Sequence, residues 1–186
     1  MRIDARGWLE GVRRVPSENR DARPDPADIS LVVVHGISLP PGEFGGDAIE
    51  ALFTNRLDPD AHPYYPQVAH LRVSAHVLIR RDGSLVQFVP FGERAWHAGQ
   101  SCHQGRTACN DFSVGIELEG ADDIAYEPVQ YRALAELIAA LAERYPAITA
   151  GRVVGHSDIA PGRKTDPGPA FEWPRLAALL AAKGLA

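Results

Sequence analysis

Two segments of the chain have hydrophobic patterns typical of buried β-strands. Residues 31–34 are four aliphatic residues in a row, as in a strand covered on both faces. Residues 112–119 instead alternate between an apolar and a polar face. The apolar face is Phe112, Val114, Ile116 and Leu118, and the polar face is Ser113, Gly115, Glu117 and Glu119. The second strand therefore presents two carboxylates beside a glycine that leaves room for another group.

Further along the chain, the pattern predicts a hairpin, a short strand and three helices. Residues 76–81 and 84–89 flank Asp82-Gly83, a pair suited to a type I′ turn. Residues 128–145 carry an apolar stripe at helical spacing, with Pro128 in the first turn and Pro146 as the stop. We expect shorter helices over 48–53, capped by Asp47, and over 174–183, and a strand over 153–155.

The alternation of strands and helices, with one hairpin, predicts an α/β fold with a mixed central β-sheet flanked by α-helices. We expect one domain over residues 1–186, of which 1–28 form an irregular lead-in. Residues 91–111 are expected to be a long loop, and loops of this length in compact domains are more often functional than idle.

Composition narrows the classes of partner. The chain has 186 residues, 45% hydrophobic and 23% charged, with a net charge of −5, which gives no electrostatic case for nucleic acid. No apolar run is long enough for a membrane span, and the N-terminus lacks the features of a secretory signal. Two cysteines are too few for a disulfide framework. We therefore expect a cytoplasmic monomer with no membrane or nucleic-acid partner.

Candidate metal ligands lie near the end of the chain. His156, Lys164 and Asp166 fall within eleven residues, in a stretch whose Pro and Gly content argues against a helix. Imidazole and carboxylate bind zinc, and a lysine beside them suits a developing oxyanion. A catalytic zinc usually has three protein ligands, and His35, at the end of a predicted strand, is the best third candidate. If the two strands are parallel neighbours, both imidazoles reach one sheet edge.

Each of these residues also has an ordinary structural explanation. A histidine at a strand end is more often a hydrogen-bonded structural residue, Asp166 can set a turn before Pro167, and Lys164 can be a surface charge. Glu117 is a candidate general base, but its periodicity is the same as that of Glu119. The pattern alone leaves that choice open.

Three further residues are candidates for substrate contact. Trp96 and His97 occupy a glycine-containing loop, where an exposed indole can stack on a sugar ring; filling the core under the loop is an equal alternative for Trp96. Arg72 can pair with a peptide carboxylate or with a surface acid.

The motifs around these residues resemble those of the AmpD-type 1,6-anhydro-N-acetylmuramoyl-L-alanine amidases, over nearly the whole chain. More distantly, the chain is similar to phage lysozyme-type amidases and peptidoglycan recognition proteins. The motifs that carry the resemblance are residues 33–35, 39–46, 74–83, 95–99, 110–119 and 155–169.

The resemblance implies a zinc ion held by His35, His156 and Asp166, with Glu117 and Lys164 as catalytic partners. It also implies hydrolysis of the amide between the lactyl group of 1,6-anhydro-N-acetylmuramic acid and L-alanine in a small soluble muropeptide. The role it implies is cytoplasmic peptidoglycan recycling, which influences β-lactamase induction in such bacteria.

Two departures from the family concern the peptide end of the substrate. Relatives often carry Asn where this chain has Gly36, and a basic residue where it has Ala108. Two alternative functions use the same scaffold: a non-catalytic muropeptide receptor, and a lytic amidase acting on intact peptidoglycan. A receptor of this kind typically lacks one or more of the metal ligands, whereas this chain keeps all three, together with Glu117 and Lys164.

Overall fold

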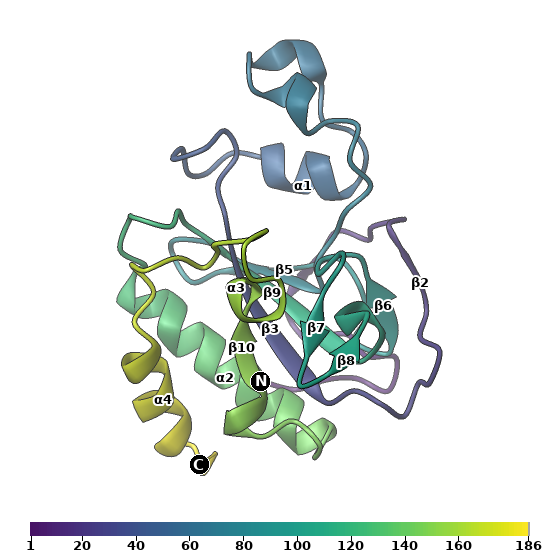
Figure 1. Ribbon diagram of the computed structural model, residues 1–186, viewed down its shortest axis with the longest axis vertical. Coiled ribbons are helices and arrows are strands. Elements are labelled where there is room, and N and C mark those ends of the chain that lie inside the picture. Colours follow the sequence, from purple (N-terminus) through teal and green to yellow (C-terminus); the bar gives the residue numbers. More distant parts are fainter. Residues whose placement is uncertain (186) are drawn as a thin grey trace.

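The computed structural model describes residues 1–185, and its centre is a six-stranded mixed sheet (Figure 1). The strand order is β1-β5-β4-β9-β3-β10, and every neighbouring pair is parallel except β4 and β5. The strands are β1 Arg13–Arg14, β5 Leu85–Gln87, β4 Val77–Ile79, β9 Ser113–Glu119, β3 Leu31–Ile37 and β10 Val153–Gly155. The α/β fold with a mixed central sheet is confirmed.

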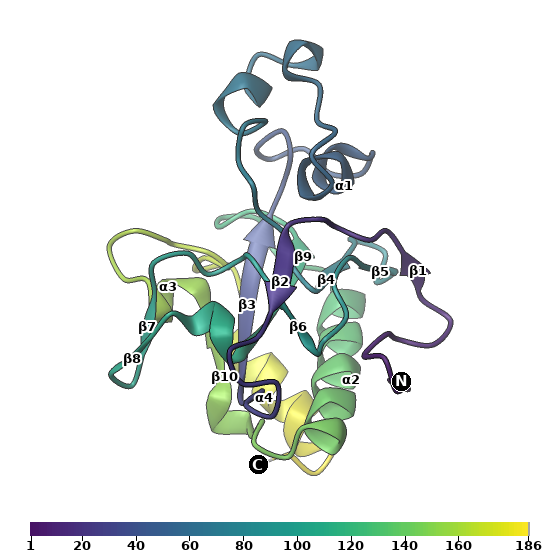
Figure 2. The same cartoon turned by 90° about the vertical axis from the view of Figure 1, so that its right-hand side faces the viewer.

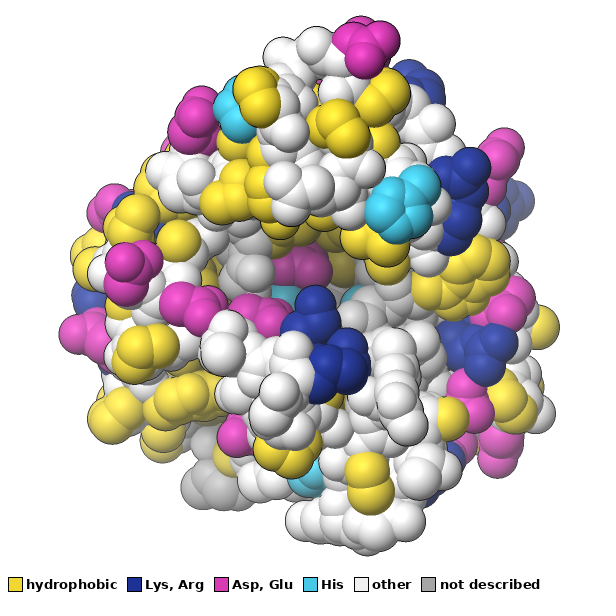
Figure 3. Space-filling model, turned by 45° about the horizontal axis from the view of Figure 1, so that its top comes forward, with side chains coloured by type: hydrophobic (Ala, Val, Ile, Leu, Met, Phe, Trp, Pro, Cys, Tyr) yellow, Lys and Arg dark blue, Asp and Glu magenta, His cyan; other side chains and the backbone are white. Residues whose placement is uncertain are grey.

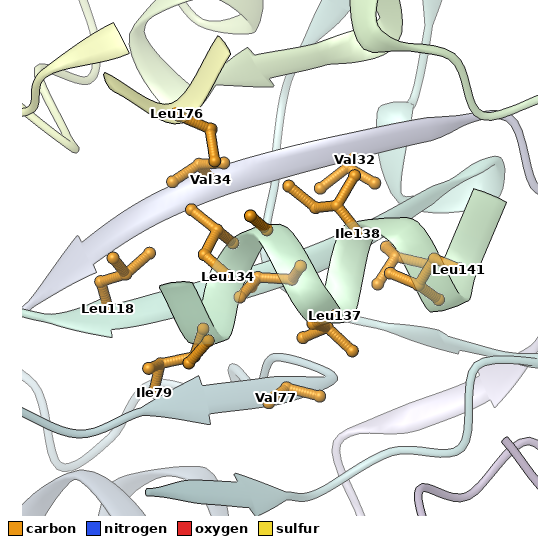
Figure 4. Close-up of a cluster of buried hydrophobic side chains, with 14 of the residues drawn as sticks. Val32, Val34, Val77, Ile79, Leu118, Leu134, Leu137, Ile138, Leu141 and Leu176 are labelled. Atoms are coloured by element: carbon orange, nitrogen blue, oxygen red, sulfur yellow. The ribbon is translucent and has the colours of Figure 1, made fainter. Parts of the chain in front are cut away.

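One face of the sheet carries the main core, covered by α2 (Pro128–Arg144) and α4 (Trp173–Ala181) (Figure 2). The predicted stripe of α2 is buried there. Leu134, Leu137 and Ile138 pack on alternate residues of β3, β4 and β9 (Figure 4). The sheet residues are Val32, Val34, Val77, Ile79, Ile116 and Leu118. Because side chains alternate across a strand, His35 and Glu117 project from the opposite face.

That opposite face is covered by two parts of the chain. Residues 38–76, between β3 and β4, contain α1 (Ala48–Phe53) and two 3-10 turns, η1 (Pro59–Ala61) and η2 (Tyr65–Gln67), and stand above the sheet in Figure 1. The second part combines two stretches of the chain. The first stretch contains β6 (Glu93–Ala95), the hairpin of β7 (Cys102–His103) and β8 (Arg106–Thr107), and η3 (Cys109–Asp111). The other stretch is helix α3 (His156–Ile159), which follows η4 (Ala150–Arg152) and β10. Both faces of β9 are therefore buried, the polar one included.

Several local expectations differ from the structure. Residues 1–28 are not wholly irregular, because β1 pairs with β5 and β2 (Arg20–Ala22) pairs with β6. The hairpin turn is not type I′: the Gly83 N–H donates to the Arg80 carbonyl and Gly83 alone has positive φ, so the connection has three residues. Asp47 precedes α1 without a side-chain cap bond, and His156 begins a one-turn helix despite the nearby Pro and Gly.

Candidate active site

The register of the sheet brings the two candidate histidines to one edge. β10 and β3 are parallel neighbours, with Gly155 opposite Val34, so the residues that follow each, His156 and His35, emerge side by side. The chain after α3 then returns, and the Asp166 carbonyl accepts the Ser157 N–H at 3.0 Å. This turn brings the carboxylate of Asp166 to both imidazoles.

Three donor atoms from these residues converge on one point. His35 Nδ1 lies 2.9 Å from His156 Nδ1 and 3.2 Å from Asp166 Oδ2, and His156 Nδ1 lies 3.0 Å from the same oxygen. The three residues form a group able to hold a metal ion. The two nitrogens are too close for both to carry hydrogen, and when neither does, three lone pairs face one another. A cation at that point removes the repulsion.

The protonation states of this group suit a metal site. Burial lowers the pKa of His35 to about 4, so its imidazole is neutral at pH 7. Burial alone would raise the pKa of Asp166, but its close contacts with the imidazoles of His156 and His35 lower it well below its ordinary value. Neutral imidazole and ionised carboxylate are the forms that bind metals. The donor set of two nitrogens and one oxygen is the type that catalytic zinc sites use.

Glu117 lies directly beside this group. It is opposite His35 in the register of β3 and β9, and only 8% of the residue is exposed. Desolvation, with the negative charge of Asp166 as a second cause, raises its pKa well above the ordinary value, while Lys164 opposes the shift. Among residues 1–185, its Oε2 finds no hydrogen-bond partner. Glu117 is thus held ready to accept a proton.

Glu119 has a different environment, which separates the two carboxylates that the periodicity could not. Its carboxylate pairs with Arg80 at 3.1 Å and accepts the N–H groups of Gly45 at 2.7 Å and Arg81 at 3.2 Å. Neither Glu119 nor any of these partners lines the cleft described next.

The triad and Glu117 line the floor of an open cleft of about 650 Å³. Lys164 lines its rim and is exposed. Apolar residues of the segment 38–76 line the opposite wall: Leu52, Phe53, Tyr64, Val68, Leu71 and Val73. Figure 3 shows the hollow, with acidic and histidine side chains at its base, hydrophobic side chains above and a basic side chain at its lower rim. Such a mixture of apolar wall and polar floor is typical of a small-molecule site.

The structure separates the three candidate substrate contacts. His97 lines the cleft, and its pKa is lowered well below the ordinary value, chiefly by burial and then by the neighbouring His35. Arg72 is exposed and lies between the cleft residues Leu71 and Val73. Trp96 is partly buried and does not itself line the cleft. Its N–H donates to the Ser74 hydroxyl at 3.1 Å, and its carbonyl accepts the Ser74 N–H at 3.0 Å.

The two departures noted in the sequence have local structural counterparts. A Cβ at Gly36 would lie 2.2 Å from the Tyr126 hydroxyl, which donates to the Pro167 carbonyl. Tyr126 therefore fills the space that a side chain at position 36 would need. Ala108 has a φ of 57° at the start of η3 and is exposed, outside the cleft.

Comparison with known proteins agrees with this geometry. The N-acetylmuramoyl-L-alanine amidase family matches residues 25–169. A 1,6-anhydro-N-acetylmuramyl-L-alanine amidase AmpD from Salmonella typhimurium is 63% identical over 95% of this chain and 94% of its own length. A crystal structure of an AmpD selenomethionine derivative superposes with a TM-score of 0.94 at 62% identity, covering 97% of this chain and 99% of that one.

A more distant structure contains a substrate. It is the complex of the amidase AmiD from E. coli with anhydro-N-acetylmuramic acid-L-Ala-D-gamma-Glu-L-Lys, with 30% identity and a TM-score of 0.61. The match covers 95% of this chain and 65% of that one.

Fold, site and similarities together define a hydrolase that cleaves an amide bond. The chain belongs to the N-acetylmuramoyl-L-alanine amidase family, and its resemblance to the AmpD type is confirmed. Within residues 1–185, no helix has the length and hydrophobicity to cross a membrane.

Proposed function

We propose that this protein hydrolyses the amide between the lactyl group of 1,6-anhydro-N-acetylmuramic acid and L-alanine of a small muropeptide, with zinc as its cofactor. Identity above 60% over nearly the full length to amidases named for the anhydro sugar supports the substrate. Convergence of His35 Nδ1, His156 Nδ1 and Asp166 Oδ2 within 3.2 Å supports the metal and is the observation that carries the proposal.

The proposed zinc ligands are His35, His156 and Asp166. Tetrahedral zinc with bonds of about 2.0–2.1 Å separates its ligands by about 3.3 Å, close to the distances between these donors. Bound there, zinc would polarise the scissile carbonyl and lower the pKa of the attacking water.

The chain's own residues would then move the protons. Glu117, facing the same point from β9, accepts a proton from the attacking water and passes it to the departing alanine amine. The raised pKa of Glu117 suits the transfer of the proton to the amine, because a carboxyl that keeps its proton at neutral pH can act as a general acid. Lys164, at the rim, stabilises the negative charge that develops on the carbonyl oxygen.

Substrate contacts are proposed at the rim. Arg72 adjoins the apolar wall and can meet a carboxylate of the stem peptide. Trp96 adjoins His97 and offers an aromatic ring to the sugar. We further propose a monomer that acts in the cytoplasm, in peptidoglycan recycling, and so influences β-lactamase induction. Its substrate is a soluble fragment, and similarity to the anhydro-specific amidases supports this role.

One experiment separates this function from its two alternatives. The purified protein is incubated with an anhydromuropeptide and, separately, with polymeric peptidoglycan, and released peptide is measured by mass spectrometry. Turnover of the soluble fragment that is lost on chelation and restored by zinc supports the proposal. Binding without turnover would identify a receptor, and preferred release from the polymer would identify a lytic amidase.

A further inference from the structure

The two imidazoles of the triad are each supported by one of two consecutive residues. His35 Nε2 lies 2.9 Å from His97 Nδ1, and His156 Nε2 lies 3.3 Å from the carbonyl oxygen of Ala98. In both rings, the nitrogen that faces away from the triad therefore has a partner on the segment 97–98. A single short segment thus contacts both histidines.

That segment is itself fixed. The side-chain oxygen of Asn110 accepts the N–H groups of His97 at 3.1 Å and of Ala98 at 2.8 Å. Arg163 donates to the Ala98 carbonyl at 2.6 Å. These bonds hold the segment's backbone from one side and its carbonyl from the other.

The His97 ring occupies a slot that β9 leaves open. A Cβ at Gly115 would lie 2.3 Å from His97 Cγ, so a side chain there excludes the ring. His97 Nε2 lies 3.2 Å from the Ser113 hydroxyl, and the ring meets His76 edge-on at 5.8 Å between centroids. With both ring nitrogens already partnered inside the protein, the imidazole is not free to bind substrate through them.

We propose that His97 is a positioning residue for the metal site, accepting a hydrogen bond from His35 Nε2–H and thereby keeping His35 Nδ1 free of hydrogen. The inference rests on the proposed metal site. His97 in turn donates from Nε2 to Ser113, which leaves its own Nδ1 as the acceptor. The hydrogen bonds then run in one direction, from His35 through His97 to Ser113.

The direction of this chain matters for metal binding. A hydrogen on His35 Nδ1 would point at the ion and exclude it, whereas a hydrogen on Nε2 leaves the lone pair of Nδ1 in place. The partner on the far nitrogen of a metal-binding histidine sets this tautomer and orients the ring, and its loss typically weakens metal affinity by about 10–100-fold.

The test measures zinc affinity by competition with a chromophoric chelator. His97→Phe keeps a ring of similar size and removes both nitrogens, and we expect a loss of about 10–100-fold. His97→Asn offers an oxygen near the position of Nδ1 and should recover much of the affinity. In the wild type without metal, ¹⁵N imidazole spectra should show hydrogen on His35 Nε2; in His97→Phe that preference should be lost.

A second variant leaves His97 itself intact. Gly115→Ala pushes the ring out of its slot and should lower zinc affinity as His97→Phe does. Gly92→Ala is the matched control, since a Cβ at Gly92 meets no atom within 4 Å. It should bind zinc like the wild type. Thermal melts of the metal-free proteins check that each variant is folded.

The outcomes distinguish this inference from the function beneath it. If wild-type protein binds no zinc at the triad, both fail. If the wild type binds zinc and both His97→Phe and Gly115→Ala bind it within twofold, only the positioning role is wrong. A raised KM with unchanged zinc affinity would show instead that His97 contacts substrate.

Discussion

His35 and Glu117 are register partners on the neighbouring parallel strands β3 and β9. Both side chains project from the face of the sheet that α2 does not cover. Their separation is therefore set by backbone hydrogen bonds between two central strands of the sheet. The proposed metal ligand and the proposed proton acceptor are therefore placed relative to one another by the sheet itself.

Replacing Glu117 should remove turnover and leave metal binding intact. Glu117→Gln keeps the shape of the side chain but cannot take a proton, and loss of a general base costs about 10²–10⁴-fold in rate. The measurements are kcat on an anhydromuropeptide and zinc per chain. A rate within threefold of the wild type would rule out this role.

The same substitution should stabilise the metal-free protein at neutral pH. Burial raises the pKa of Glu117 in the folded state, so folding binds the proton, and wild-type stability falls as pH rises above the ordinary glutamate pKa of about 4.3. Glutamine does not titrate. Thermal melts in chelator should therefore show Glu117→Gln above the wild type at pH 7 and level with it near pH 4. A constant difference across this range would contradict the raised pKa.

Loss of Asp166 should release the metal. Asp166→Ala removes one of three donors and the only negative charge among them, so zinc per chain after dialysis should fall well below one. Asp123→Asn is the control, because Asp123 also lines the cleft but does not belong to the triad. Equal zinc retention in both variants would exclude Asp166 as a ligand.

Glu119→Gln should act on stability and not on chemistry. It weakens a charged bond to Arg80, in which Glu119 is only 2% exposed, and hydrogen bonds to charged groups contribute about 1.5–3 kcal/mol. Urea unfolding should show a loss of that size, with kcat near the wild-type value. The contrast with Glu117→Gln tests which carboxylate is catalytic.

A side chain at Gly36 should disturb Tyr126. Gly36→Ala places a Cβ 2.2 Å from the Tyr126 hydroxyl, which must move and release the Pro167 carbonyl. We expect a lower melting temperature, and the double variant Gly36→Ala with Tyr126→Phe should recover part of it because the clashing oxygen is gone. No recovery would show that the contact is not the cause.

Much of the fold could be predicted from the sequence because its long elements have clear periods. The apolar residues of β3 and β9 have the spacing typical of a buried strand, and those of α2 have the spacing of a helix face. The two-residue strands β1 and β7 show no period, since their pairing depends on distant partners. The type of turn at Gly83 was determined by the three-residue length of the connection, and the Asp-Gly pair alone therefore predicted the wrong type.

The candidate site was predictable in part for a similar reason. His156 directly follows a strand, as the sequence predicted, whereas His35 lies within β3, which continues past the predicted end to Ile37. The contact of His97 with His35 joins residues 62 positions apart. Its only indication in the sequence is Gly115, a glycine on the polar face of a strand, against which the His97 ring packs. That glycine indicated space but not which group fills it. Glu117 and Glu119 share a period, and only their surroundings in the fold, such as the ion pair of Glu119 with Arg80, tell them apart.

The cleft draws its two walls from independent stretches of polypeptide. The triad is anchored to β3, to the start of α3 and to the return turn after it, whereas the apolar wall belongs to the excursion between β3 and β4. Substitutions of those wall residues can reshape what the enzyme accepts, since the three donor atoms are held by other stretches of the chain. Preference for one muropeptide over another is thus free to diverge while the hydrolytic apparatus stays as it is.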